Sequence, residues 1–186
     1  MGRTLVLVTG PPAAGKTTLA VPLAARLGLP LVAKDAVKEA LASAVPCPPS
    51  GEDASEGGPA SRAAEWSQAL GAASFEVIWT IAERFEGVVL EANFHPSDSH
   101  HRKKLLDLGR PLEVFCSCPT DEALRRYRSR AAGRHPVHIE TDLSSERMAQ
   151  FESPLRLGPV LVVDTTQPVD LDGIVAWIRE TASNGV

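Results

Sequence analysis

The chain has 186 residues, of which 44% are hydrophobic and 23% are charged, a balance typical of one globular domain with a single packed core. Its formal net charge of −4 gives no overall attraction to phosphodiester backbones or anionic membranes, so any contact with nucleic acid would need a local basic patch. The apolar run near the N-terminus is too short for a secretory signal and no apolar stretch reaches membrane-spanning length, so we expect a cytoplasmic protein without a membrane partner.

The chain begins with the pattern of a buried strand followed by a helix. The run Thr-Leu-Val-Leu-Val at residues 4–8 is apolar and β-branched, as in a parallel strand covered on both faces. Leucines at helical spacing then predict a helix over residues 16–27, which Gly28 ends. Pro22 lies inside that helix, and we expect it to kink the helix because it removes a backbone donor.

A second strand and a long helix follow. Residues 31–33 read as a short strand, after which a helix begins near Ala36. Proline and glycine dominate residues 46–60, which predicts a loop. Apolar residues then recur every three to four positions over residues 63–85, the spacing of one long amphipathic helix, and residues 88–90 form a third buried strand.

The rest of the chain keeps the same alternation. We expect helices over residues 97–108, 121–132 and 171–181, and strands over residues 112–116 and 160–163. Strands that alternate with helices, without an internal repeat, predict the α/β class: a parallel sheet between two helical layers, with right-handed crossovers. We expect the whole chain, residues 1–186, to form one such domain.

A phosphate-binding motif connects the first strand to the first helix. Gly10-Pro11-Pro12-Ala13-Ala14-Gly15-Lys16-Thr17 fits the pattern G-x-x-x-x-G-K-[ST]. Its glycines let backbone N–H groups point at a β-phosphate, and the helix N-terminus adds partial positive charge. Lys16 can reach the β- and γ-phosphates, and the Thr17 hydroxyl can ligate magnesium. We predict a site for ATP, or another nucleoside triphosphate, with Mg²⁺, made by Gly10, Ala13, Ala14, Gly15, Lys16, Thr17 and Thr18.

With this motif the chain resembles the nucleoside-monophosphate-kinase-like branch of P-loop proteins, in particular the small kinases often labelled AAA-family ATPases. It is similar to chloramphenicol phosphotransferase and to the kinase domain of polynucleotide kinases. The resemblance covers nearly the whole chain and implies a three-layer P-loop kinase fold with five parallel strands in the order 2-3-1-4-5. It also implies an acceptor-binding insertion at about residues 37–81 and a lid at about residues 125–140.

Asp35 follows the second strand, at the carboxyl edge where ligands bind in open parallel sheets. It stands in the sequence Lys-Asp-x-x-Lys, whose second lysine is Lys38. In the similar enzymes an aspartate at this place holds or deprotonates the acceptor hydroxyl, so the resemblance implies that Asp35 is catalytic and that Asp35 and Lys38 bind substrate. The alternative role is an N-cap for the next helix, and one residue can fill both roles.

Glu91 and Asn93 follow the third strand in the sequence Leu-Glu-Ala-Asn-Phe. A carboxylate at this edge can hold a magnesium-bound water or a substrate hydroxyl, and Asn93 can hydrogen-bond the acceptor. The pattern departs from an aspartate preceded by four apolar residues, so the role in magnesium binding stays open. A structural hydrogen bond at the strand end is the alternative for Glu91.

An arginine cluster follows the fourth strand and comprises Arg125, Arg126, Arg128, Arg130 and Arg134. Arg126 and Arg130 are four residues apart and share a helix face. In the similar kinases, lid arginines neutralise charge on the transferring phosphoryl group, which implies catalytic roles for Arg126 and Arg130, nucleotide contact for Arg126 and acceptor contact for Arg134. A solvated helix face, with Glu122 placed to pair with Arg126, is the alternative. After the fifth strand, where similar kinases wrap backbone around adenine, Thr166 is expected to contact the nucleotide.

Together these features predict an ATP- and Mg²⁺-dependent phosphotransferase that moves the γ-phosphate onto a hydroxyl of a small molecule, such as a sugar, an antibiotic or a nucleoside-like compound. A polynucleotide 5′-hydroxyl kinase is one alternative, for which the basic run at residues 100–104 is the only credible track. A nucleotide-hydrolysing switch is the second alternative, although the guanine-specifying Asn-Lys-x-Asp is absent. The sequence is compatible with a monomer or a homodimer.

Overall fold

The computed structural model describes residues 3–47, 59–139 and 144–184. Most of the loop expected over residues 46–60, part of the expected insertion at 37–81 and the last residue of the expected lid therefore lie outside the described residues. The described chain forms one five-stranded sheet whose strands are all parallel and follow the order β2-β3-β1-β4-β5, as predicted. These strands are β1 (Thr4–Thr9), β2 (Leu31–Ala33), β3 (Gly87–Glu91), β4 (Pro111–Ser117) and β5 (Val160–Asp164).

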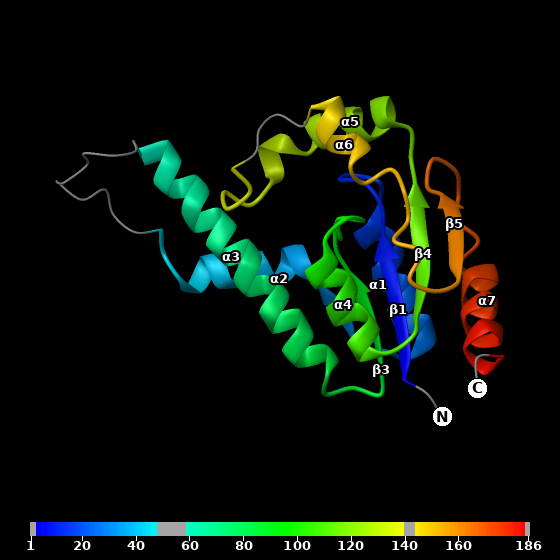
Figure 1. The fold of residues 1–186 in the computed structure, drawn as a ribbon. Coiled ribbons are helices and arrows are strands. Elements are labelled where there is room, and N and C mark those ends of the chain that lie inside the picture. Colours follow the sequence, from blue (N-terminus) through cyan, green and yellow to red (C-terminus); the bar gives the residue numbers. More distant parts are fainter. Residues whose placement is uncertain (1–2, 48–58, 140–143, 185–186) are drawn as a thin grey trace.

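Helices cover both faces of this sheet (Figure 1). They are α1 (Lys16–Leu27), α2 (Lys34–Ala44), α3 (Pro59–Ala82), α4 (Ser99–Leu108), α5 (Thr120–Ser129), α6 (Ser145–Ala149) and α7 (Leu171–Ser183), with a 3-10 turn η1 (Ala131–Gly133). In Figure 1, α5 and α6 lie together beyond the carboxyl ends of β1 and β4. The short helix α6 has no counterpart among the elements expected from the sequence.

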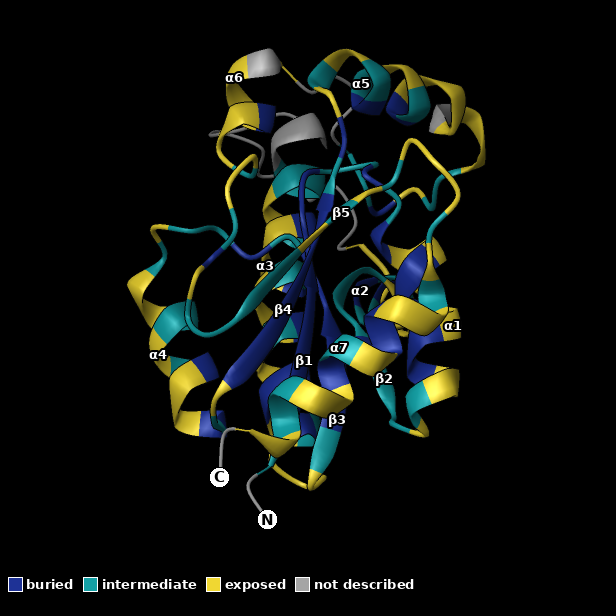
Figure 2. Cartoon of the chain, turned by 90° about the vertical axis from the view of Figure 1, so that its right-hand side faces the viewer, coloured by how far each residue is buried: buried dark blue, intermediate teal, exposed yellow. Residues whose placement is uncertain are grey.

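The central strand β1 explains why the fold has three layers. Val6 and Val8 belong to a core that includes residues of α1 and α7, whereas Leu5 and Leu7 belong to a core with residues of α3 and α4. All four side chains are fully buried. Because side chains alternate along a strand, the continuous apolar run supplies both cores at once, and Figure 2 shows this strand enclosed by the helices.

The helix α1 spans the predicted residues and ends as predicted. Gly28 has φ 67°, and its N–H donates to the carbonyls of Ala24 and Ala25. The helix continues through Pro22 to Leu27. A left-handed glycine therefore closes the helix without the steric cost that a side chain would add.

The long helix α3 differs from the prediction at both ends and in its buried face. It begins at Pro59 and ends at Ala82, so Phe85 lies beyond it with 41% of its surface exposed. The apolar spacing over residues 63–85 predicts that Ala73 is buried, but Ala73 is exposed and the adjacent Ser74 is fully buried. The Ser74 hydroxyl donates to the Leu70 carbonyl oxygen at 2.6 Å, and this internal hydrogen bond makes its burial possible.

Within the described part of the chain, no helix is long and apolar enough to cross a membrane.

Candidate active site

The phosphate loop curls between β1 and α1 through backbone angles that few side chains tolerate. Gly10 and Gly15 have φ 133° and φ 84°, and Ala13 has φ 61° despite its Cβ. The Ala14 N–H donates to the Pro11 carbonyl at 3.2 Å, which tightens the turn. The Ala14 side chain is fully buried in the core, so this residue can meet a phosphate only through its backbone.

We expect Gly10→Ala to lower the free energy of unfolding by about 3 kcal/mol or more, because the backbone strain of a side chain at positive φ adds to the steric overlap of the new Cβ. A Cβ at Gly10 would overlap the carbonyl oxygen of Cys116 on β4, at a positive φ. Gly28→Ala is the matched control: its Cβ would meet no atom within 4 Å, so only the backbone strain of about 1–2 kcal/mol applies. Urea unfolding of both variants measures the difference, and equal losses would refute the close approach of loop and β4.

Lys16 is buried at the base of this loop, 7% exposed. Its Nζ donates to the carbonyl oxygens of Gly10 at 3.1 Å and Pro11 at 2.7 Å. Burial lowers the pKa of the Lys16 ammonium, and the nearby Glu91 carboxylate offsets part of that shift. Lys16 and Thr17 line a cavity of about 230 Å³ whose other polar side chains include Asp35.

Thr17 and Glu91 meet at the edge of this cavity. The Thr17 hydroxyl donates to Glu91 Oε2 at 3.1 Å, so the expected magnesium-binding hydroxyl and the carboxylate at the end of β3 are neighbours. Burial raises the pKa of Glu91, while the charge of Lys16 opposes that shift. Among the described residues, no group of three or more His, Cys, Asp or Glu is arranged to hold a metal ion, but Mg²⁺ bound through nucleotide phosphates needs only one or two protein ligands.

Glu91→Gln should raise the thermal unfolding midpoint at pH 8 without magnesium. Because the pKa of Glu91 is raised, the folded protein binds this proton more tightly than the unfolded chain, so the ionised carboxylate destabilises the fold above that pKa. The advantage of the variant should shrink as the pH falls through the raised pKa. Thermal scans at several pH values test this, and a lower midpoint at every pH would contradict it. Affinity for magnesium-ATP should fall in the same variant.

Asp35 lies in the first turn of α2, which begins at Lys34, directly after β2. The N-cap of α2 is Ala33, and no side chain caps the helix, so the capping interpretation of Asp35 is wrong. Because β2 ends at Ala33 and α2 begins at Lys34, Asp35 is the second residue of the helix. Asp35 Oδ1 accepts from Lys34 Nζ at 3.2 Å. Burial alone would raise the pKa of Asp35, but the positive charges of Lys34 and His138 outweigh it and hold that pKa below its ordinary value.

A second cavity of about 290 Å³ adjoins the first. The two share lining residues, namely Pro12, Asp35, Asn93, Tyr127, Arg134 and His138. Lys38 lines only the second cavity, where its Nζ donates to Ser67 Oγ at 2.7 Å. Among the described residues, the buried Oδ1 of Asn93 has no hydrogen-bond partner. The predicted substrate residues Asp35, Lys38, Asn93 and Arg134 thus surround one cavity, whereas Glu91 lines only the first.

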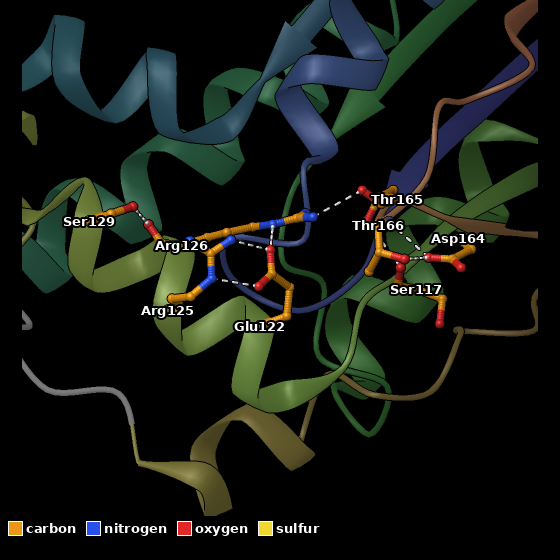
Figure 3. A network of polar contacts seen from close by, with 8 residues as sticks. All are labelled: Ser117, Glu122, Arg125, Arg126, Ser129, Asp164, Thr165 and Thr166. Carbon is orange, nitrogen blue, oxygen red and sulfur yellow. Dashed lines mark hydrogen bonds and ion pairs between the residues drawn. The ribbon is translucent and has the colours of Figure 1, made fainter.

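A third cavity of about 560 Å³ lies on the other side of the phosphate loop and is mostly apolar. Its lining includes Thr18, Pro22, Arg126, Arg130, Thr165 and Gln167. Thr166 is not among the lining residues: its N–H and hydroxyl both donate to Asp164 Oδ1, at 2.8 and 2.7 Å (Figure 3). Its two neighbours, Thr165 and Gln167, line this cavity, so the contact of Thr166 with a nucleotide stays a prediction.

The arginines of the cluster have different surroundings. Arg126 Nε donates to Glu122 at 2.6 Å and its Nη2 donates to the Thr165 carbonyl at 3.2 Å, as Figure 3 shows. Hydrogen bonds from Arg125 and Arg126 lower the pKa of Glu122 to about 2. Arg125 and Arg128 are exposed and line none of the three cavities, which agrees with a solvated face for these two.

Two more arginines of the cluster, the C-cap of α5 and one beyond the turn η1, line the first cavity. Arg130, the C-cap of α5, lines the first and third cavities. Arg134 lines the first and second, and its guanidinium lies 4.4 Å from the centre of the Tyr127 ring. The first cavity therefore joins the phosphate loop, the arginines Arg130 and Arg134, and the carboxylate of Asp35 on α2.

A family model described as an AAA domain matches residues 5–154, which include the phosphate loop and the elements from β1 to α6. The chain belongs to this AAA domain family. No functionally curated protein matches this AAA domain significantly in sequence.

Among solved structures, this AAA domain is similar to a proposed kinase from Chloroflexus aurantiacus, with 30% identity, a TM-score of 0.77, and coverage of 97% of this chain and 99% of that one. A gluconokinase from Sinorhizobium meliloti is 19% identical with a TM-score of 0.58, covering 98% and 95% of the two chains. A shikimate kinase from Acinetobacter baumannii in complex with shikimate is 20% identical with a TM-score of 0.54, covering 100% and 96%. The last two likenesses concern the fold, which is of the P-loop kinase type.

Sequence reasoning missed a buried carboxylate behind the phosphate loop of this AAA domain. Glu113, 1% exposed on β4, accepts from the Thr9 hydroxyl at 2.6 Å and from the backbone N–H groups of Leu155 at 2.9 Å and Arg156 at 3.0 Å. It ties the end of β1 to the segment after α6. A single charged residue inside an otherwise apolar strand was the available signal. Tyr127 and Ser67, which line the cavities, carried no such signal.

Proposed function

We propose that this AAA domain is an ATP- and Mg²⁺-dependent kinase that moves the γ-phosphate of ATP onto a hydroxyl of a small molecule. One observation carries the proposal: Lys16 of the phosphate loop and Asp35 of α2 line the same cavity. That cavity shares residues with a polar cavity on one side and with a mostly apolar cavity on the other. A nucleoside, its phosphates and an acceptor therefore have adjacent places.

The phosphate loop would bind the phosphate donor, ATP. Backbone N–H groups and Lys16 would hold the β- and γ-phosphates, and Thr17 with Glu91 would hold magnesium directly or through water. Magnesium neutralises charge on the phosphates when it is bound with the nucleotide. The apolar cavity near Pro22 and Gln167 would take the base.

Asp35 would orient the phosphate acceptor. Because its pKa is lowered, Asp35 is ionised at neutral pH and can accept a hydrogen bond from the acceptor hydroxyl. As the bond from the acceptor oxygen to the γ-phosphorus forms, the bond from phosphorus to the β,γ-bridging oxygen breaks and ADP leaves. The hydroxyl proton passes to Asp35 late in this step and then to solvent.

A lid over the acceptor would come from the second half of α5 and the segment that follows it. Val137 packs with Ala42 of α2 and Leu70 of α3, and its carbonyl oxygen accepts from Ser67 Oγ at 2.7 Å. His138 Nε2 lies 2.8 Å from Glu39 Oε1. We infer that residues 125–140 act as the lid and that residues 37–81 bind the acceptor, because the described parts of both segments meet at these contacts.

Arg130→Ala should lower kcat by about 10-fold or more and change the dissociation constant of ATP little, since its charge acts where the phosphoryl group transfers. Arg128→Ala is the control, because that exposed arginine of the same helix lines none of the three cavities. Steady-state kinetics with ATP titrations separate the two effects. A loss equal to that of the control would assign Arg130 to the solvated face.

The proposal is tested by incubating the protein with ATP, Mg²⁺ and single hydroxyl compounds, with phosphate addition detected by mass. The panel should hold sugars, sugar acids, aminoglycosides, nucleosides, amphenicols and a 5′-hydroxyl oligonucleotide. Within the described chain, no residue of the basic run 100–104 lines any of the three cavities, which favours a small acceptor over a polynucleotide. ATP turnover that no compound accelerates, with no compound phosphorylated, would contradict the proposal.

A further inference from the structure

We propose that Gly71 of α3 decides which acceptors fit the second cavity, an inference that rests on the proposed function. Its missing side chain leaves room for the part of the acceptor that is remote from the reacting hydroxyl, and that part lies against the helix backbone. Gly71 lines the second cavity together with Ser67 and Gln68 of the same helix. None of the three lines the first or the third cavity, so this wall borders the acceptor and not the nucleotide.

The usual structural reasons for a glycine do not apply at this position. Gly71 lies in the interior of α3 (Pro59–Ala82), where glycine is unfavourable because its backbone has the most freedom to lose. Its φ is not positive, so no left-handed turn requires it. Among the described residues, a Cβ at Gly71 would meet no atom within 4 Å, so no neighbouring element excludes a side chain. The absent side chain therefore leaves open space at the wall of the second cavity.

A side chain at this position would point toward residues that line the cavity. Side chains in an α-helix lean toward its N-terminus, so a side chain at Gly71 would lie over the turn that holds Ser67 and Gln68. Other faces of the same helix differ, because Ser74 is fully buried and Ala73 is exposed. The cavity has a volume of about 290 Å³, near the lower end for small-molecule sites. A larger residue at Gly71 would therefore take space that the acceptor needs.

The wall formed by Ser67, Gln68 and Gly71 is neutral. The Ser67 hydroxyl is already engaged, because it donates to the Val137 carbonyl oxygen and accepts from Lys38 Nζ, both at 2.7 Å. The Gln68 residue is exposed, and a glutamine amide can both donate and accept hydrogen bonds. Such a wall suits a neutral ring that carries hydroxyl groups, with the ring on the backbone at Gly71 and a hydroxyl on Gln68.

Substitutions of graded size at Gly71 separate acceptor binding from folding. Gly71→Ala and Gly71→Leu are tested with ATP, Mg²⁺ and single probes, namely glycerol, glucose, gluconate, kanamycin, adenosine and chloramphenicol, with phosphate addition detected by mass. Ala73→Leu is the matched control, because Ala73 is exposed on the same helix and lines none of the three cavities.

The two substitutions should move stability and acceptor binding in different ways. Gly71→Ala should raise the thermal unfolding midpoint, since alanine favours a helix more than glycine does. For each ring compound that the parent protein phosphorylates, Gly71→Leu should raise the KM by about 10-fold or more, the scale of a steric misfit in a pocket. The KM for ATP should change little, and Ala73→Leu should keep both parent values.

A thiol at the same position reports binding without phosphoryl transfer. Cys47 is exposed, whereas Cys116 and Cys118 are buried, so Gly71→Cys and Ala73→Cys are each made in a Cys47→Ser background. With a non-hydrolysable ATP analogue present, a saturating ring probe should slow the reaction of the Gly71→Cys thiol with methyl methanethiosulfonate severalfold. The Ala73→Cys thiol should react at the same rate with and without the probe.

The two measurements distinguish failure of this inference from failure of the proposed function. A ring probe that the parent and Gly71→Leu proteins phosphorylate with the same KM would overturn the inference and leave the kinase proposal intact. A ring probe that protects the Gly71→Cys thiol but is not phosphorylated would support the inference and count against the kinase proposal. The inference is also overturned if no ring probe protects that thiol.

Discussion

Lys16→Ala is expected to lower kcat by about 100- to 1,000-fold, the cost of removing one positioned donor from charge that develops in a transition state. The Lys16 ammonium donates to the Gly10 and Pro11 carbonyls and lines the first cavity. A nucleotide phosphate would replace these neutral acceptors with a charged one, so the lysine contributes most when the phosphoryl group moves.

Stability should be kept in this variant. Burial lowers the pKa of Lys16, so the ammonium form is disfavoured by the fold at neutral pH and its loss does not remove a favourable charge. Thermal unfolding beside single-turnover kinetics measures both properties, with Lys104→Ala as the control. A folded Lys16→Ala protein with more than half of the parent rate would rule out the assigned role of the phosphate loop.

Asp35→Asn is expected to lower kcat by about 100-fold or more, the usual scale for losing a positioned base. Asparagine keeps the size of the side chain but has no charge, so it can touch the acceptor hydroxyl without taking its proton. Asp35 lines both the first and the second cavity, and it is the one carboxylate that does so among the described residues. ATP binding should change little, as calorimetry would measure.

The unfolding midpoint of Asp35→Asn should also change little at pH 7. A lowered pKa means that ionised Asp35 stabilises the fold above the ordinary aspartate pKa and that this contribution is lost as the pH falls through the lowered value. The Asp35 side chain is 50% exposed, so its pairing with Lys34 contributes at most about 1 kcal/mol. If the variant transfers phosphate at nearly the parent rate, the base lies elsewhere and Glu91 is the next candidate.

Local patterns were sufficient for the fold and the phosphate loop. The loop motif and the apolar strand before it are contiguous in sequence, so each could be recognised from neighbouring residues alone. Helix boundaries were less certain, because α2 begins directly after β2 and a sequence pattern does not resolve a shift of two residues. That shift decided whether Asp35 caps α2 or faces the cavities.

The second cavity could not be predicted in the same way. Ser67, Tyr127 and Arg147 come from α3, α5 and α6, and only tertiary packing brings them together. The arrangement of Arg134 over Tyr127 spans the turn η1, outside the three- and four-residue spacing that a helix pattern predicts. After β5, the Asp164 carboxylate accepts hydrogen bonds from Thr166, whereas the adjacent residues Thr165 and Gln167 line the third cavity.

The most direct measurement follows the γ-phosphate itself. ATP labelled at the γ-phosphate is incubated with the protein, Mg²⁺ and the best acceptor of the panel, and ADP, phosphorylated acceptor and inorganic phosphate are quantified together. We predict that ADP forms only with acceptor present, with one phosphorylated acceptor for each ADP. ADP and inorganic phosphate that form at the same rate with or without acceptor would contradict it and identify a nucleotide-hydrolysing protein instead.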